Sequence, residues 1–226
     1  MFTSHTPRHW IHVGVIFALL LGLAAQAVPV QAAGVHFYVS TTGNNGNDCL
    51  TPASACLTIQ GAVDKAGNDD TIHVAPGTYA NPVNIQGRSG IAIIGDDTAT
   101  VIIRPTSTLD WNYFGHTTGR QTVFRVVDST NITLSNMTMD FSVIRGNNRF
   151  GIFYANSTGT VSNNVLENMS VSDASGGYYE MCSYFRALAP YTDASRANVT
   201  ISNNEFIDCG RVAIVTHDYV NATIDG

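Results

Sequence analysis

The sequence contains few charged residues and only one lysine. Asp, Glu, Lys and Arg make up 12% of its 226 residues. Lys65 is the single lysine, and there are ten arginines. The formal net charge of −6 gives no basic field to attract nucleic acid, so we expect no nucleic-acid partner. Nucleotide, haem and zinc patterns are also missing, and the Asn/Gly-rich residues 43–48 lack the acid spacing of a calcium loop. We therefore predict no metal site.

The sequence also lacks an apolar run of membrane-spanning length. The run at 13–25 has 13 residues, whereas a transmembrane helix needs about 18 or more. Arg8 and His9 precede this run, and small residues follow it at 25–27 and 30–32, which is the pattern of a cleaved signal peptide. We predict a signal peptide at 1–32 and a mature chain that is secreted or held at the cell surface, with an uncleaved anchor as the alternative.

Cysteines are few but even in number. They are Cys49, Cys56, Cys182 and Cys209, in a chain that we expect to be exported, where disulfides form and persist. Sequence order favours the pairs Cys49–Cys56 and Cys182–Cys209, although four cysteines allow three pairings. Free buried thiols are the alternative for the second pair.

Heptads and long apolar stripes of helical period are missing as well. What recurs is a short β-branched run, a small polar turn, another short run and then Asn, as in "TVSNNVLENMSV" and "VTISNNEFIDC". The corresponding residues Leu134, Val161, Ile201 and Ile224 are 27, 40 and 23 residues apart. A unit of about 20 to 28 residues, lengthened in places by an insertion, is the period of a solenoid.

The residues distinguish between two solenoids of this period. Leucine-rich repeats need an L-x-x-L-x-L pattern and a helical half, and here leucine is sparse. Short strands with Gly, Asn and Asp at their corners instead favour a parallel β-helix. Alternation agrees, because Phe124 and Val126 would point inward while Arg125 points outward.

The recurring asparagines are explained by this architecture. Asn tolerates the left-handed conformation of a sharp corner, and stacked amides hydrogen-bond from coil to coil. We expect Asn136, Asn164 and Asn204 to form such a ladder. The same phrases create N-x-[ST] glycosylation sequons, and we favour the structural interpretation over modification. The sequons are at Asn131, Asn136, Asn156, Asn168, Asn198 and Asn221.

An amphipathic helix precedes the coils. Ile59, Ala62, Val63 and Ala66 share one helical face, with Thr58 as a possible N-cap and Gly67 as a possible C-cap. Such a helix suits the open end of a solenoid as a lid. We predict an all-β fold, a right-handed parallel β-helix with a short N-terminal capping helix. Residues 33–80 form the cap module and 81–226 the coils, with an apparently incomplete C-terminal end where we expect further coils or another chain.

These features resemble a known group. The segment 36–79, with "CLTIQGAVDKA" and "DTIHVAPGTY", and the later "SNN" coils are similar to secreted right-handed parallel β-helix proteins of the pectin-lyase-like superfamily. The resemblance covers nearly all of the mature chain and is specific for the fold. It is weak for function, since this solenoid hosts lyases, hydrolases, epimerases, adhesins and proteins without known activity.

The catalytic signatures of the superfamily's hydrolases are missing. The G-H-G and R-I-K stretches of the galacturonan hydrolases do not occur. The acid pairs Asp69-Asp70 and Asp96-Asp97 follow turns, and we expect solvated turn residues rather than two carboxyls facing one bond. We therefore disfavour a hydrolase.

A β-eliminating lyase remains an alternative. In lyases of this fold the base is often Lys or Arg, and calcium is a frequent cation. Lys65 lies on the expected cap helix, which leaves arginine. Arg125 and Arg186 occupy one position in our alignment of the repeats and Arg211 opens the last coil, so these three are the candidate catalytic residues. His217 and Asp218 form part of the D-P-H-D element of related epimerases without its first two residues, and adjacent strand residues usually point to opposite faces.

Aromatic and arginine side chains gather where the repeat is interrupted, at 104–121, 142–150 and 173–186. Rings cover sugar faces and guanidinium groups bind carboxylates, so we predict contact with a polysaccharide, with an anionic one as a candidate. Aromatic residues that fix long loops to the scaffold are the alternative. The candidate binding residues are Trp111, Tyr113, His116, Arg120, Arg145, Arg149, Tyr178, Tyr179, Glu180, His217 and Asp218.

Two functions follow from the sequence. The first is a non-catalytic exported β-helix that binds extracellular or cell-surface polysaccharide through loops on one face, without a cofactor. The second is a uronate-polysaccharide lyase, or a related carbohydrate-active enzyme, with arginine as the base and calcium as a possible cation.

Overall fold

The computed structural model describes residues 34–110, 121–142, 149–169, 180–187, 197–210, 212–218 and 220–226. The predicted signal peptide at 1–32 lies outside these residues. Among the described residues, none of the helices has the length and apolar character needed to cross a membrane.

Three parallel sheets make up the described chain, and each complete coil contributes one strand to each sheet. Sheet A is β1 (His36–Val39), β2 (Thr71–Val74), β5 (Ala92–Gly95), β9 (Ile132–Ser135), β12 (Gly159–Ser162), β15 (Ala197–Ser202) and β18 (Val220–Asp225). Sheet B is β3 (Gly77–Tyr79), β6 (Val101–Ile103), β10 (Thr138–Asp140), β13 (Val165–Glu167) and β16 (Glu205–Ile207). Sheet C is β4 (Val83–Gln86), β8 (Gln121–Val127), β11 (Arg149–Ala155), β14 (Glu180–Ala187) and β17 (Val212–Asp218), and β7 (Leu109–Asp110) pairs antiparallel with β8.

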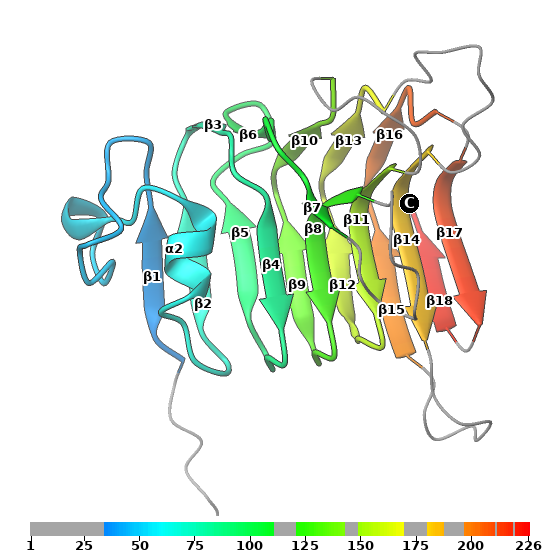
Figure 1. Ribbon diagram of the computed structural model, residues 1–226, viewed down its shortest axis with the longest axis horizontal. Helices are drawn as coiled ribbons and strands as arrows, with labels where there is room; N and C mark the ends of the chain where they lie inside the picture. Colours follow the sequence, from blue (N-terminus) through cyan, green and yellow to red (C-terminus); the bar gives the residue numbers. More distant parts are fainter. Residues whose placement is uncertain are drawn as a thin grey trace, which may run out of the picture. The chain divides into compact units, whose positions relative to one another are not determined.

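The coils wind in a right-handed sense. In Figure 1 the strands of sheet A run upward at the back, the chain crosses through sheet B at the top, and sheet C runs downward in front while the chain advances from left to right. This is the handedness that parallel crossovers adopt in nearly all proteins. The predicted right-handed parallel β-helix is confirmed.

The core is a set of stacked inward columns. In sheet A one column contains Ile72, Ile93, Leu134, Val161 and Ile201, each at most 2% exposed. Burying each such side chain stabilises the fold by about 1.5–3 kcal/mol relative to an exposed position. The core therefore grows with every coil, as the alternation in the sequence predicts. The column continues to Ile224 on β18, which is 60% exposed, and further coils or another chain at that end stay a prediction.

The two asparagines of each "SNN" phrase have different roles at the corner between sheets A and B. Asn164 donates to the carbonyl oxygen of Leu134 (3.0 Å) and to Asn204 Oδ1 (3.1 Å), and Asn204 donates to the carbonyl oxygen of Val161 (2.7 Å). The predicted amide ladder is confirmed for these two. Asn136 was assigned to it wrongly, because it takes the corner position before the ladder residue, with φ 59°.

That corner position is left-handed in three coils. Asn163 (φ 55°) and Asn203 (φ 53°) share the conformation of Asn136, as the predicted tolerance of Asn for such corners requires. Several sequon amides also donate within the fold, for example Asn156 to Asp128 (2.8 Å) and Asn168 to Asp140 (3.1 Å). These contacts favour the structural interpretation of the sequons, and glycosylation itself stays untested.

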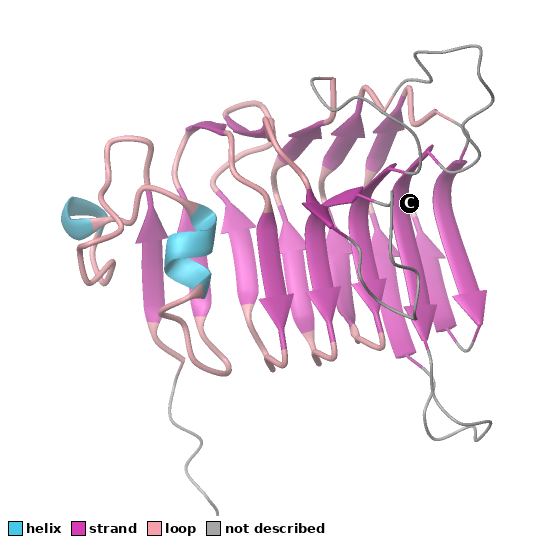
Figure 2. Ribbon diagram, in the orientation of Figure 1, coloured by secondary structure: helices cyan, strands magenta, loops and turns pink. Residues whose placement is uncertain are grey.

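The helix α2 (Ile59–Val63) lies where the first coil lacks a strand of sheet C. Thr58 caps it by accepting from the Gly61 N–H at 3.0 Å, as predicted, but it ends at Val63 with Asp64 as C-cap rather than Gly67. Figure 2 shows this helix and the short turn η1 (Pro52–Ser54) at the N-terminal end of the stack. The helix contacts β1, β2 and β4, so it covers the side of the first coil.

Both predicted disulfides are present. Cys49–Cys56 closes the loop that contains η1, and Cys182–Cys209 joins β14 to the segment that follows β16. All four cysteines are oxidised, so the free-thiol alternative for the second pair is excluded.

Candidate functional site

The outward face of sheet C carries a cluster of aromatic side chains. Phe150 and Phe153 of β11 pack against Tyr184 of β14, with ring centroids 4.9 Å and 5.8 Å from the tyrosine ring. Phe153 and Tyr184 are partners in the register of β11 with β14, which sets their rings one strand apart. The cluster is separate from the interior core and includes Val127 and Ala155. We call these five residues the sheet C cluster.

Three polar side chains adjoin the sheet C cluster at the C-terminal ends of β14 and β17. Arg186 Nε donates to Asp218 Oδ2 at 2.5 Å, and His217 Nδ1 lies 2.8 Å from Asp218 Oδ1. The His217 ring also lies near that of Tyr184, with centroids 6.5 Å apart. These three, the Arg186–His217–Asp218 group, combine one cation, one carboxylate and one imidazole beside the sheet C cluster, whose side chains are buried.

The backbone explains why His217 and Asp218 face the same side. Neighbouring residues on a strand point to opposite faces, and the sequence alone predicts that separation. Asp218, however, has φ 61°, which turns its carboxylate back toward His217 and Arg186. Asp128 (φ 48°) and Asn156 (φ 49°) end earlier strands of sheet C in the same way. An Asp or Asn at the C-terminal end of each of these strands was the sequence signal for this turn.

The electrostatics of the group centre on Asp218. Burial alone would raise its pKa, but hydrogen bonds from Arg186 and His217 outweigh burial and hold the pKa below its ordinary value. The carboxylate is therefore ionised at neutral pH and keeps Arg186 in one orientation. Since the side chain of Arg186 is 17% exposed and that of His217 is 53% exposed, the group borders the solvent.

The prediction that Arg125 and Arg186 occupy one position of the repeat is wrong. Arg125 is the register partner of Phe153, which pairs with Tyr184, whereas Arg186 pairs with Ala155, which pairs with Val127. The two arginines thus lie in different columns of sheet C, two residues apart along the strands. A shift of two residues preserves the inward–outward alternation, so the alignment of Arg125 with Arg186 could not reveal it. Arg125 instead donates to Asn84 Oδ1 at 2.7 Å and to Gln86 Oε1 at 3.2 Å.

The structure describes two of the other predicted site residues. Arg149 starts β11 and is 2% exposed, and its register partner is Glu180, the first residue of β14. Both residues therefore belong to strands, whereas the sequence analysis expects them in loops. The remaining predicted residues lie outside the described ones, namely Trp111, Tyr113, His116, Arg120, Arg145, Tyr178, Tyr179 and Arg211.

The acid pairs divide into two kinds. Asp96 and Asp97 are exposed in a turn, as predicted. Asp70, by contrast, is 6% exposed and accepts from the N–H groups of Val35 (2.7 Å) and Gly67 (2.6 Å), so it is a structural residue rather than a solvated one. In the part of the chain that the structure describes, no three His, Cys, Asp or Glu side chains gather as metal ligands.

Sequence reasoning missed Phe150, Phe153 and Tyr184 as a group. They belong to strands rather than to the long loops where we expected aromatic contacts. The available signal was the alternation itself, because Phe153 and Tyr184 are large aromatic residues at outward positions of their strands, and both are buried there.

Comparison with known proteins agrees with this fold. No family model matches the chain, and no curated protein matches it. It is similar to two crystal structures of GH136 lacto-N-biosidase from Eubacterium ramulus, the native protein and its selenomethionine derivative, each with 15% identity and a TM-score of 0.51. Each match covers 76% of this chain and 34% of that chain, so this chain spans about a third of the length of the lacto-N-biosidase.

A further structure, a mutant pectin methylesterase in complex with hexasaccharide IV, matches with 11% identity and a TM-score of 0.31, over 78% of this chain and 80% of that one. At these identities the likeness concerns the fold alone. The parallel β-helix that the resemblance to the pectin-lyase-like superfamily implies is confirmed by the sheet topology and by the likeness to the lacto-N-biosidase structures.

Proposed function

We propose that this chain is an exported β-helix that binds an anionic polysaccharide on the outward face of sheet C. The observation that carries the proposal is the continuity of the sheet C cluster with the Arg186–His217–Asp218 group. The residues of the cluster are at most 7% exposed, so a sugar ring would pack its apolar face against the exposed His217 ring that borders the cluster. The guanidinium group of Arg186 would take a uronate carboxylate, since its planar fork matches carboxylate geometry.

The arrangement favours binding over catalysis. A lyase needs a base that removes a proton, whereas the Nε–H of Arg186 is engaged as a donor to the Asp218 carboxylate. Asp218 thus orients the guanidinium group and offsets part of its charge, so Arg186 is better suited to donate hydrogen bonds to a ligand than to act as a base. In the lyase alternative, His217 therefore replaces arginine as the candidate base, and calcium is the candidate cation.

Export is part of the same proposal. Two disulfides close within the described chain, and disulfides of this kind persist in oxidising compartments. Together with the predicted signal peptide at 1–32, they support a secreted or cell-surface location, where polysaccharide is available as a partner.

Calorimetric titration with oligogalacturonate tests the proposal. Arg186→Gln removes the cation but keeps a polar side chain, and we expect affinity to fall roughly 10- to 100-fold, as for loss of a charge-assisted hydrogen bond of about 1.5–3 kcal/mol. Arg88→Gln is the matched control, because it makes the same charge change at a residue that bonds the carbonyl oxygen of Ala66 instead. Equal losses in the two variants would contradict a specific site.

Absorbance in the near ultraviolet separates the two functions. A β-elimination leaves a conjugated double bond, so a lyase would raise the absorbance of a uronate polymer with time. We expect flat traces with and without calcium. A rise that His217→Gln abolishes would replace the binding proposal with the enzyme.

A further inference from the structure

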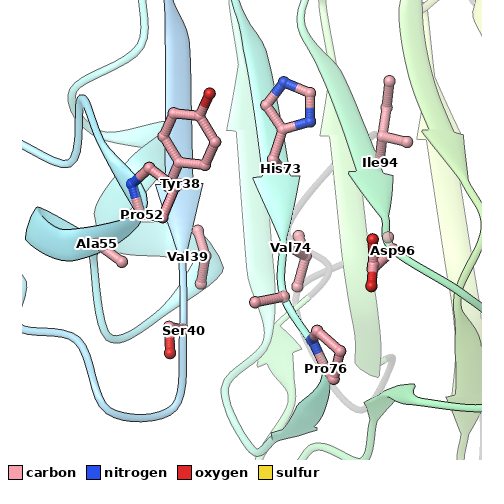
Figure 3. A pocket seen from close by; sticks show the side chains of 12 residues that line it. Tyr38, Val39, Ser40, Pro52, Ala55, His73, Val74, Pro76, Ile94 and Asp96 are labelled. Atoms are coloured by element: carbon pink, nitrogen blue, oxygen red, sulfur yellow. The ribbon is translucent and has the colours of Figure 1, made fainter.

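A groove of about 620 Å³ crosses the outward face of sheet A at its N-terminal end. It belongs to different strands from the sheet C site, since β1, β2 and β5 form its floor and the segment around η1 contributes to its wall. Figure 3 shows Tyr38, His73 and Ile94 in a row on three neighbouring strands, with Ser40, Pro76 and Asp96 farther along them.

The row presents two aromatic rings and an aliphatic side chain in register. Tyr38 pairs with His73, and His73 pairs with Ile94. The Tyr38 and His73 rings have centroids 5.2 Å apart and planes within 22° of parallel, and Figure 3 looks onto both ring faces. Burial, and then the neighbouring His36, lower the pKa of His73, so its ring is neutral at pH 7. The row therefore offers an apolar platform of the kind that packs against a sugar ring.

Polar groups border the platform. Within the described residues, neither the Asp96 carboxylate nor the Tyr38 hydroxyl makes a hydrogen bond. His73 Nε2 lies 2.8 Å from His36 Nδ1, which fixes the orientation of the His73 ring. An acceptor-only carboxylate and a hydroxyl on opposite sides of a ring platform suit a ligand with several hydroxyl groups.

Charge selects the class of saccharide. Asp96 is the one acidic residue that lines the groove, and neither Lys nor Arg lines it. A uronate carboxylate placed here would meet a like charge without a cation, whereas vicinal sugar hydroxyls would donate to the carboxylate. The groove thus favours an uncharged ring, in contrast to the site that contains Arg186.

The groove is fixed in shape and extends beyond one ring. The disulfide Cys49–Cys56 closes the segment that forms its wall. Asp96 also lines an adjoining polar groove of about 480 Å³, whose walls include Asn136, Asn163 and Glu205. Two grooves that share a wall residue provide a path for an oligomer rather than for a single sugar.

We propose that this groove binds an uncharged oligosaccharide, with one sugar ring packed on Tyr38 and His73 and its hydroxyls donating to Asp96. The site goes beyond the sheet C site and does not depend on it. A protein with both sites would hold a neutral and an anionic segment of polysaccharide at once.

NMR titration with neutral hexasaccharides of glucose, galactose, mannose and N-acetylglucosamine tests the proposal, with the ring protons of His73 as the reporter. We expect at least one of these probes to shift the His73 signals in a saturable way. Tyr38→Ala should weaken that probe about tenfold through loss of the ring surface, and Asp96→Ala should weaken it by a similar factor through loss of the acceptor. Thr200→Ala, an exposed change on the same sheet outside the groove, should leave the affinity unchanged.

The outcomes separate this site from the sheet C site. Saturable shifts that both groove variants weaken would establish the groove whether or not oligogalacturonate binds at Arg186. No shift with any of the four probes, or equal affinity in wild type, Tyr38→Ala and Asp96→Ala, would overturn the proposal. Because Asp96 is exposed in a turn, its variant keeps the test valid even where Tyr38→Ala does not fold.

Discussion

Asn163 and Asn164 are neighbours in the chain but stabilise the corner in different ways. Asn163 adopts φ 55°, and its contribution is a backbone conformation. Asn164 is 1% exposed, and its amide serves Leu134, Met137 and Asn204 at once. A buried amide with three partners is costly to remove, whereas a left-handed residue can be replaced by glycine.

We therefore predict opposite sensitivities at these positions. Asn164→Ala should lower the free energy of unfolding by about 2–3 kcal/mol, because buried partners lose their hydrogen bonds. Asn163→Gly should change it by less than about 1 kcal/mol, since glycine adopts positive φ readily. Urea unfolding of both variants gives the comparison, and equal losses would contradict the division of roles.

His73 makes stability depend on pH. Its pKa is lowered from 6.5 in the folded protein, by burial first and then by His36. Below pH 6.5 the unfolded chain takes up this proton more readily than the folded one, so stability falls as pH decreases through that range. Urea unfolding between pH 7.5 and 5 should show a smaller decline for His73→Gln than for wild type. An identical decline would show that His73 does not carry this dependence.

Several of these residue roles were visible in the sequence. Phe124, Val126 and the Asn-rich corners were assigned from alternation and turn chemistry, because period-two patterns and left-handed positions restrict residue type directly. Asn136 could not be separated from Asn164, since the two differ by one position in a phrase of similar letters. Only the backbone of each coil shows which asparagine lies at the corner and which lies in the ladder.

At the scale of elements, α2 protects an open edge of sheet C. The Gln60 side chain accepts from the Asn84 N–H at 2.7 Å and donates to the Asn84 carbonyl oxygen at 3.3 Å. A side-chain amide thus makes the two contacts to β4 that a neighbouring strand would make. Unpaired edges invite pairing with other chains, and this contact blocks one of them.

Gln60→Ala should expose that edge. We expect a loss of about 1–2 kcal/mol in the free energy of unfolding and faster hydrogen exchange at the Asn84 amide. Gln60→Glu keeps the acceptor for the Asn84 N–H but loses the donor to the Asn84 carbonyl oxygen. Hydrogen exchange at the Asn84 amide in this variant should therefore be faster than in wild type and slower than in Gln60→Ala. Unchanged exchange at Asn84 in Gln60→Ala would contradict an edge-covering role.

The register between strands was the part of the fold that sequence could not supply. The inward–outward pattern restricts strand pairing only to even shifts, and Arg125 and Arg186 were aligned two residues out of register for that reason. The Arg186–His217–Asp218 group was missed as a unit because it depends on this register and on the positive φ of Asp218. Its members were each singled out, but their contact required the coils to be stacked.

At the scale of the whole coil stack, the two disulfides differ in the length of chain that they close. Cys182–Cys209 spans 27 residues and links successive coils, whereas Cys49–Cys56 spans 7 residues within the N-terminal segment. By loop-closure entropy, replacing both Cys182 and Cys209 by Ser should lower the free energy of unfolding by about 3.5 kcal/mol. Replacing both Cys49 and Cys56 by Ser should lower it by about 2.4 kcal/mol. Urea unfolding of the two double variants checks this order, and a larger loss for the Cys49–Cys56 variant would contradict it.

The stack presents two surfaces of different chemistry. On sheet C the exposed His217 ring lies beside Arg186, and the outward face of sheet A combines Tyr38 and His73 with the carboxylate of Asp96. A rigid solenoid holds such surfaces at fixed positions, which suits the binding of an extended polymer more than the enclosure of a small molecule. The central claim is that Arg186 recognises the negative charge of that polymer.

The most direct test compares one polysaccharide before and after chemical reduction of its carboxylates to hydroxyls, with wild type and Arg186→Gln, by calorimetric titration. We predict that reduction weakens wild type roughly 10- to 100-fold and changes the affinity of Arg186→Gln much less, because the charge and the guanidinium group act as a pair. Equal losses on reduction in both proteins would show that the charge is read elsewhere, or not at all, and would contradict the account.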